Sequence, residues 1–188
     1  DGDGLFPIRY PLRQVAARAP GYRRAEIAGV AAGQPIEQRL QDIRPKALYL
    51  TVYGVSSRII RNEALKLVEE TELNALVIDV KGDKGFIPYK SDIPLATAIG
   101  AQKLRLIGDI KGLLQSLKAK GVYTIARIVV FKDDLLGSAR PDLVIKTTAG
   151  TIWKDRERLT WVDPSKKEVW NYNIAIAVEA AQLGFDEI

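Results

Sequence analysis

Charged and polar side chains stand near the ends of three apolar segments of this chain. Asp79 lies near the end of one segment, and Lys81 follows it after one further residue. Arg127 lies within the next segment, Asp133 comes shortly after it, and Tyr53 lies at the end of an earlier one. In parallel α/β folds, ligands bind beyond the carboxyl ends of the strands. This pattern predicts a shared site where carboxylates meet a ligand or a cation from a neighbouring strand.

A structural role for the same charges is equally open. Asp79 could form an ion pair with Arg127 or Lys81 that fixes the strand register and does no chemistry. Asp133 and Asp134 could be solvated loop carboxylates. The KGDKG run that begins at Lys81 superficially resembles a phosphate loop. It lacks the GxxxxGK[ST] pattern and no helix follows it directly, so we interpret it as a turn.

A long connection, residues 135–162, carries Trp153, Asp155 and Trp161. Long loops in compact domains tend to be functional. Aromatic side chains stack on the apolar faces of sugar rings, and charged groups bind the hydroxyls. The connection therefore indicates a sugar-binding surface, and the alternative is a lid whose tryptophans plug the core.

Composition restricts the chemistry further, because the 188 residues include no Cys and no His. Disulfides, Ser-His-Asp and Cys-His catalysis, and zinc sites built on Cys or His are excluded. Acid–base chemistry must come from Asp, Glu, Lys or Tyr, and we expect no metal and no other cofactor. The net charge of +5 is modest and spread along the chain, so we expect no nucleic-acid partner. No apolar run is long enough to span a membrane. The compartment stays open, with an extracytoplasmic or secreted location favoured.

The frequency of proline and glycine changes near residue 46. Residues 1–46 hold five of the nine prolines and several glycines, which predicts an irregular lead-in segment. After it, continuous apolar runs alternate with segments of helical spacing. We expect strands at 46–54, 74–80, 122–131 and from 185 onward, and helices at 56–70, 103–121 and 163–184. Ser56 or Ser57, and Asp163 followed by Pro164, have the residue types of helix N-termini, and Gly184 is typical of a helix end.

This alternation predicts an α/β fold with a parallel sheet covered by helices. The sheet could close as a (β/α)8 TIM barrel or stay a small open parallel α/β sheet. A barrel needs about 250 residues, so we expect residues 47–188 to form the first half of one, truncated after the start of strand four. Unpaired edges in such a half predict association with the remainder of its own barrel or with another copy of itself.

The part of the chain from Lys46 to Ile188 resembles a family of bacterial glycoside-hydrolase-like proteins, proposed to be (β/α)8 barrels. The resemblance rests on ALVIDVKGDKGFIPY, on TIARIVVFKDD, and on the long segment that ends in GFDEI. In that family GFDEI continues into a strand with another acidic residue, which this sequence does not include. The motif positions that the resemblance covers are Asp79, Lys81, Arg127, Asp133, Trp153, Asp155, Trp161 and Asp163.

The resemblance implies hydrolysis of a glycosidic bond in a polysaccharide by carboxylate acid–base chemistry, with Asp79 and Asp133 as the catalytic pair. The substrate-binding residues expected with them are Tyr53, Lys81, Arg127, Trp153, Asp155 and Trp161. Two alternatives stay open. One is a non-catalytic glycan-binding or scaffold module, and the other is a small α/β domain that binds a phosphorylated ligand. The glycan, the stereochemistry and the identity of the acid among the two carboxylates are also open.

Overall fold

The computed structural model describes residues 11–33 and 35–188, which divide near Arg44 into two compact units. In the first unit, β1 (Leu12–Ala17) and β2 (Ala25–Val30) form an antiparallel two-stranded sheet. Regular strands therefore occupy part of the lead-in segment, for which short strands or a short helix were open beside irregular structure. The first ten residues of that segment lie outside the described residues.

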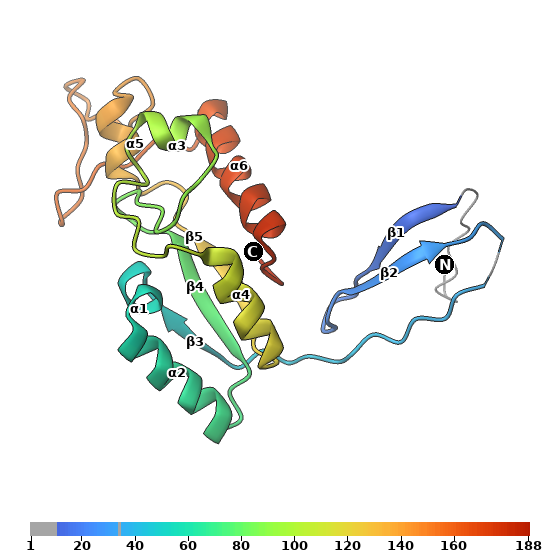
Figure 1. Ribbon diagram of the computed structural model, residues 1–188. Coiled ribbons are helices and arrows are strands. Elements are labelled where there is room, and N and C mark those ends of the chain that lie inside the picture. Colours follow the sequence, from blue (N-terminus) through green and yellow to red (C-terminus); the bar gives the residue numbers. More distant parts are fainter. Residues whose placement is uncertain (1–10, 34) are drawn as a thin grey trace. The chain divides into compact units, whose positions relative to one another are not determined.

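The second unit is a mixed α/β structure around a parallel sheet, which confirms the expected fold class at this level (Figure 1). The sheet has three strands in the order β3-β4-β5. They span Ala47–Leu50, Ala75–Lys81 and Tyr123–Ile128. A long helix follows each strand along the chain: α2 (Arg58–Glu70), α4 (Ile110–Ala119) and α6 (Lys167–Leu183). This order follows the predicted alternation of strands and helices.

The two faces of this sheet differ in burial. Alternate residues of the central strand, Leu76, Ile78 and Val80, belong to the buried core that the helices share. The intervening residues point to the opposite face. On that face the register aligns Tyr49 with Val77, and Asp79 with Arg127. We call this second face, which exposes half of the Tyr49 side chain, the open face of the sheet.

The first strand of this sheet is shorter than predicted. It ends at Leu50, whereas the continuous apolar sequence predicted a strand to residue 54. Thr51 caps a short helix, α1 (Val52–Ser56), by accepting a hydrogen bond from the N–H of Gly54. The cap ends the strand, since the backbone must turn into the helix there.

Two of the predicted helix boundaries are confirmed and two are wrong. The helix expected from residue 103 begins only at Ile110, where Asp109 caps α4. Ser57 caps α2, and Gly184 ends α6 with a left-handed φ of 109°. The same helix was expected to begin at Asp163, but its N-cap is Lys166. Asp163 instead accepts hydrogen bonds from the N–H and the hydroxyl of Ser165, at 2.8 and 2.7 Å, and these bonds lower its pKa. The carboxylate therefore closes a turn before the helix rather than capping the helix itself.

Short helices occur before and after β5 along the chain, in segments where no helix was predicted. They are α3 (Pro94–Ala98) and α5 (Asp134–Ala139). Beyond α6, Ala126 donates a hydrogen bond of 2.8 Å to the carbonyl of Glu187, which forms a parallel bridge with Ile125. The expected fourth strand is thus present as a single bridge on the outer edge of β5. In the described part of the chain, no helix combines the length and the apolar character that crossing a membrane requires.

Candidate functional site

Asp79 is the centre of a hydrogen-bonded network on the open face of the sheet. Its Oδ1 atom accepts a bond of 2.7 Å from Arg127 on β5, and its Oδ2 atom accepts one of 2.6 Å from the hydroxyl of Tyr49 on β3. Arg127 also donates to the Tyr49 hydroxyl at 3.2 Å, and its guanidinium lies 5.2 Å from the centre of the Tyr49 ring. Three neighbouring strands therefore contribute one polar side chain each to the network.

The network encloses the carboxylate while its partners stay accessible. Asp79 is 4% exposed, whereas half of Tyr49 and nearly half of the Arg127 side chain reach solvent. Burial and the hydrogen bond to Asp79 raise the pKa of Tyr49 to about 12. The hydrogen bond to Asp79 also raises the pKa of Arg127. At neutral pH the partners of Asp79 are therefore a charged guanidinium and a neutral phenol.

Lys81 and Asp133 form a second and separate pair. Lys81 Nζ lies 2.7 Å from Asp133 Oδ2, and neither side chain has any exposed surface. Burial lowers the pKa of Lys81, and the Asp133 charge opposes that shift. The ammonium also lies 5.4 Å from the ring centre of Tyr172 on α6. This pair connects the end of β4 to the segment that follows β5.

Asp133 has a further structural task as the N-cap of α5. Its Oδ1 atom accepts a hydrogen bond of 2.9 Å from the N–H of Leu136. Gly85 packs directly against the same carboxylate, because a Cβ at that position would lie 2.1 Å from Asp133 Oδ1. Both carboxylate oxygens are thus engaged inside the protein, and no atom of Asp133 is reachable from solvent in this arrangement.

Sequence reasoning grouped the strand-end charges together, whereas the structure divides them into two pairs. Asp79 meets Arg127, and Lys81 meets Asp133. Asp79 and Asp133 share no contact in the described part of the chain. The ion pair of Asp79 with Arg127, which was an open structural alternative, is present, and it lies on an accessible face.

The long connection between α5 and α6 contains a second polar centre, at Asp155. Its Oδ2 atom accepts a hydrogen bond of 3.0 Å from Trp161 Nε1 and lies 2.9 Å from Lys132 Nζ. The bond from Trp161 and the charge of Lys132 hold the pKa of Asp155 well below its usual range. Lys132 also pairs with Glu157, and the Glu157 and Asp155 carboxylates raise its pKa.

The aromatic residues predicted to bind sugars lie at the surface. Trp153 is 40% exposed, and its ring packs edge-to-face against Trp161 with the ring centres 6.3 Å apart. Tyr53 is 56% exposed and lies on α1. The tryptophans therefore do not plug the core of the unit, and Trp153 presents an aromatic surface to solvent.

Sequence reasoning missed one residue of these centres, Tyr49. It could have been found from strand alternation, because it precedes Thr51 by two residues and so points to the same face. Lys132 was expected among the charges that follow the strand of Arg127, but its acidic partners could not be predicted, since the three of them come from two distant loops. No group of three or more acidic side chains that could hold a metal ion occurs among the residues that the structure describes.

Known proteins resemble the part of the chain that carries these residues. The family described as "Putative glycosyl hydrolase domain" matches residues 47–188, which include all three strands of the parallel sheet and the Asp155 loop. A crystal structure of a hypothetical protein from Ruminiclostridium thermocellum ATCC 27405 is similar to this chain, with 40% sequence identity and a TM-score of 0.70. The alignment covers 75% of this chain and 73% of that one, so the two chains are of similar length.

A more remote similarity connects the chain to a crystal structure of a noncanonic maltogenic alpha-amylase, AmyB, from Thermotoga neapolitana. The sequence identity is 14% and the TM-score 0.48, over 75% of this chain and 37% of that one. No curated protein matches the sequence.

Proposed function

The chain belongs to the family of putative glycosyl hydrolase domains, and from that premise we propose that the open face around Asp79 binds a polysaccharide and takes part in cleaving its glycosidic bond. The observation that carries this proposal is the network in which Tyr49 and Arg127 hold the Asp79 carboxylate on an accessible sheet face. No other carboxylate predicted to be catalytic has this combination of fixed orientation and accessible surroundings.

Asp79 suits the role of the carboxylate that stabilises developing positive charge at the sugar ring. Glycosidic cleavage passes through an oxocarbenium-like state, which a fixed carboxylate stabilises or attacks. The hydrogen bond from Arg127 fixes one of its oxygens, and the hydrogen bond from Tyr49 fixes the other. Arg127 has further N–H groups that can bind sugar hydroxyls, since nearly half of its side chain is exposed.

We give Asp133 a positioning role in place of the catalytic role suggested by its motif. A carboxylate with no exposed atom cannot touch a substrate, and both of its oxygens are already engaged. Through Lys81 it holds the end of β4, the strand that carries Asp79. Lys81 shares this task, because its ammonium is equally enclosed.

The exposed aromatic residues extend the proposed binding surface. Trp153 offers a face on which a sugar ring can stack, and Trp161 holds it from the side. Asp155 orders this surface through its hydrogen bond from the indole of Trp161. Tyr53 offers a second exposed ring, on the helix that follows β3.

Replacing Asp79 by Asn tests the proposal, because the change removes the charge and keeps the shape. We expect release of reducing ends from a panel of polysaccharides by the natural protein, and at least about a hundredfold loss in Asp79→Asn, since electrostatic groups of this kind contribute about 10²–10³ in rate. Asp109→Asn is the matched control, because Asp109 caps α4 and Asn caps helices equally well. Hydrolysis that survives Asp79→Asn contradicts the catalytic role.

A second candidate function is a glycan-binding module without hydrolysis. It is favoured by one observation: both carboxylates predicted to be catalytic are buried, Asp79 at 4% and Asp133 at 0% exposure, whereas hydrolysis usually needs two carboxylates that reach the substrate. Polysaccharide binding that depends on Trp153, with no cleavage of any glycan in the panel, supports this alternative.

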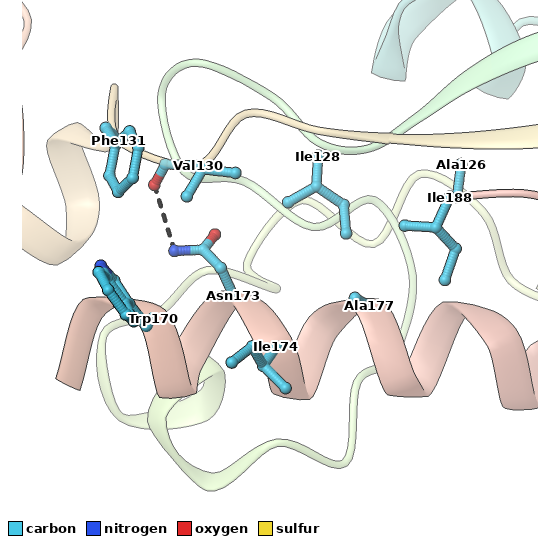
Figure 2. Close-up of a pocket in the computed structure, with 9 residues that line it drawn as sticks. All are labelled: Ala126, Ile128, Val130, Phe131, Trp170, Asn173, Ile174, Ala177 and Ile188. Carbon is cyan, nitrogen blue, oxygen red and sulfur yellow. Dashed lines mark hydrogen bonds between the residues drawn. The ribbon is translucent and has the colours of Figure 1, made fainter. Parts of the chain in front are cut away.

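We infer that the parallel sheet is the first part of a (β/α)8 barrel in residues 47–188, preceded by a separate lead-in segment. The bridge of Glu187 to Ile125 supports this inference, because it begins a parallel strand on the edge of β5. Beside that bridge an apolar groove of about 460 Å³ runs between β5 and α6 (Figure 2). Ile128, Ile174 and Ile188 line it, and a continuation of the strand that begins at Glu187 would cover Ile128 and Ile174.

The apolar groove at the edge of β5 predicts that the sheet needs a partner, either further strands of its own barrel or another copy of this chain. Trp170 on α6 lines the groove and is half exposed. Quenching of Trp170 fluorescence by acrylamide tests for the partner, with Trp153→Phe and Trp161→Phe changes isolating the signal. A shielded Trp170 in a monomer supports barrel closure within one chain, and shielding that disappears on dilution supports a second copy.

A further inference from the structure

The connection between α5 and α6 contains a tightly organised hairpin at residues 154–160 (orange in Figure 1). Lys154 and Thr160 form an antiparallel bridge at its base. Inside the turn, Asp155 Oδ1 accepts hydrogen bonds from the N–H groups of Glu157 and Leu159, at 2.9 and 3.0 Å. The other carboxylate oxygen binds the Trp161 indole and Lys132. The Asp155 carboxylate thus fixes the conformation of the whole turn.

The turn places Arg158 in an unusual backbone conformation. Its φ of 63° lies in the left-handed region, and it is the only non-glycine residue with a positive φ in the described part of the chain. Glycine adopts this conformation without steric cost, and arginine does not. Strained positions of this kind concentrate at functional sites. The arginine side chain therefore has a candidate function that explains why glycine does not occupy this position.

The tip of the hairpin carries more positive than negative charge that is not paired. Asp155 and Glu157 are both paired with Lys132. The nearby Asp134 accepts the N–H of Thr160 and lies 3.9 Å from Lys154. Every acidic group of the hairpin therefore has a partner already.

Two cations remain after this pairing. Arg156 and Arg158 are exposed, and neither forms an ion pair with any residue that the structure describes. They are separated by one residue, on a turn that Asp155 holds from inside, and the exposed Trp153 lies just before the hairpin in the sequence. Rigid presentation lowers the entropy that binding must overcome, so the tip is organised to meet an anion.

We propose that this hairpin tip binds an anionic polysaccharide, whose sugars carry carboxylate, sulfate or phosphate groups. Arg156 and Arg158 bind the anionic groups, because guanidinium matches their geometry with two parallel hydrogen bonds. Trp153 stacks on a sugar ring of the same chain. The inference rests on the proposed carbohydrate function and adds the charge of the substrate to it.

Titration calorimetry with two polymers of one backbone tests this inference. Polygalacturonate is the charged polymer, and its fully methyl-esterified form is the neutral one. We expect the natural protein to bind the charged polymer, more weakly as salt rises because exposed charges are screened, and to bind the neutral form at least about tenfold more weakly. Heparin and a phosphate-bearing glycan identify which anionic group binds most tightly.

Three variants assign the effect to the hairpin. Arg156→Gln and Arg158→Gly should each weaken binding of the charged polymer about tenfold, the loss expected for one hydrogen bond between charged groups at the surface. Arg158→Gly should leave the melting temperature unchanged or raise it, because glycine relieves the left-handed strain. Arg105→Gln, an exposed arginine outside the hairpin, is the control and should leave binding unchanged.

The outcomes separate this inference from the proposed function. Equal binding of the charged and neutral polymers, lost in Trp153→Ala, overturns the inference and leaves the carbohydrate function standing. Unchanged affinity in both arginine variants overturns it as well, and so does tighter binding of duplex DNA than of any polysaccharide. If no polysaccharide binds, both the inference and the proposed function fail.

Discussion

The hydroxyl of Tyr49 donates a hydrogen bond of 2.6 Å to Asp79, although thirty residues separate the two in the sequence. The parallel register of β3 and β4 places both side chains on the open face. Arg127 completes the contact from the next strand, at 2.7 Å from Asp79. An otherwise enclosed carboxylate is therefore oriented by two accessible neighbours, which is why we regard this network as the core of the site.

Removing the Tyr49 hydroxyl should weaken this network without altering the fold. Tyr49→Phe keeps the ring over Arg127 and removes the bond to Asp79, so we expect a loss of about 1 kcal/mol in the free energy of unfolding. Glycan binding at Asp79 should fall as well, since the carboxylate loses one of its two fixed contacts. Urea denaturation at pH 7 measures the first effect, and Tyr53→Phe is the control because no network partner of its hydroxyl is seen here.

The same variant has a pH signature. Folding raises the pKa of Tyr49 from 10.0 to about 12, so its stabilising effect is complete below pH 10 and is lost as the pH rises towards 12. The difference in unfolding free energy between the natural protein and Tyr49→Phe should therefore narrow across this interval. A difference that stays constant from pH 9 to 12 contradicts the assigned hydrogen bond.

Breaking the buried pair from one side should be far more damaging. Lys81→Met leaves the Asp133 carboxylate buried without a cation, which costs about 3–5 kcal/mol in comparable pairs. Asp133→Asn keeps an N-cap for α5, because Asn also caps helices. The double variant should lose less stability than the sum of the two single variants, since each change removes the need for the other partner. Strictly additive losses in chemical denaturation contradict a direct pair.

Gly85 should not tolerate even alanine. Its φ is +86°, and the added methyl carbon would lie 2.1 Å from Asp133 Oδ1. We expect Gly85→Ala to destabilise the protein by about 2 kcal/mol more than Gly150→Ala, because overpacking adds to the left-handed strain. Gly150 is the matched control, with a φ of +80° and no atom within 4 Å of the added methyl. Equal melting temperatures of the two variants would contradict the close packing of Gly85 against Asp133.

Acid should release the hairpin that Asp155 organises. Its carboxyl has a folded-state pKa below the ordinary 3.8, so its stabilising effect is present above pH 3.8 and is lost as the pH falls through the lower folded value. The emission of Trp161 should change in this acidic range as its indole N–H loses the carboxylate. Asp155→Asn should lack the transition, and a transition of the same midpoint in that variant would assign it to another group.

Elements that depend on near neighbours could be predicted from the sequence. The apolar run around Asp79 identified β4, the hydroxyl of Ser57 identified the start of α2, and Gly184 identified the end of α6. The apolar sequence after Leu50 was misleading, because a strand and a short buried helix both need apolar residues there. The bond from the N–H of Gly54 to Thr51 and the helical backbone bonds that follow it distinguish the two cases.

Pairings between distant segments could be predicted only in part: the pair of Asp79 with Arg127 was one of the alternatives, and the other pairings were not expected. Sequence reasoning selected Asp79, Arg127, Lys81 and Asp133 as a group, and their division into two pairs depends on the register shift between Asp79 and Lys81. The shift changes how the end of β4 meets β5, and no local pattern announces it. The hairpin centre is similar, since Asp155 and Lys132 meet only when the long connection folds back.

A crystal structure with a bound oligosaccharide tests the central claim most directly. The account predicts a sugar ring on the open face, with a ring atom or hydroxyl within hydrogen-bonding distance of Asp79 and with Arg127 in contact with the same ligand. An oligosaccharide bound only elsewhere, with the Tyr49, Asp79 and Arg127 network untouched, would contradict it.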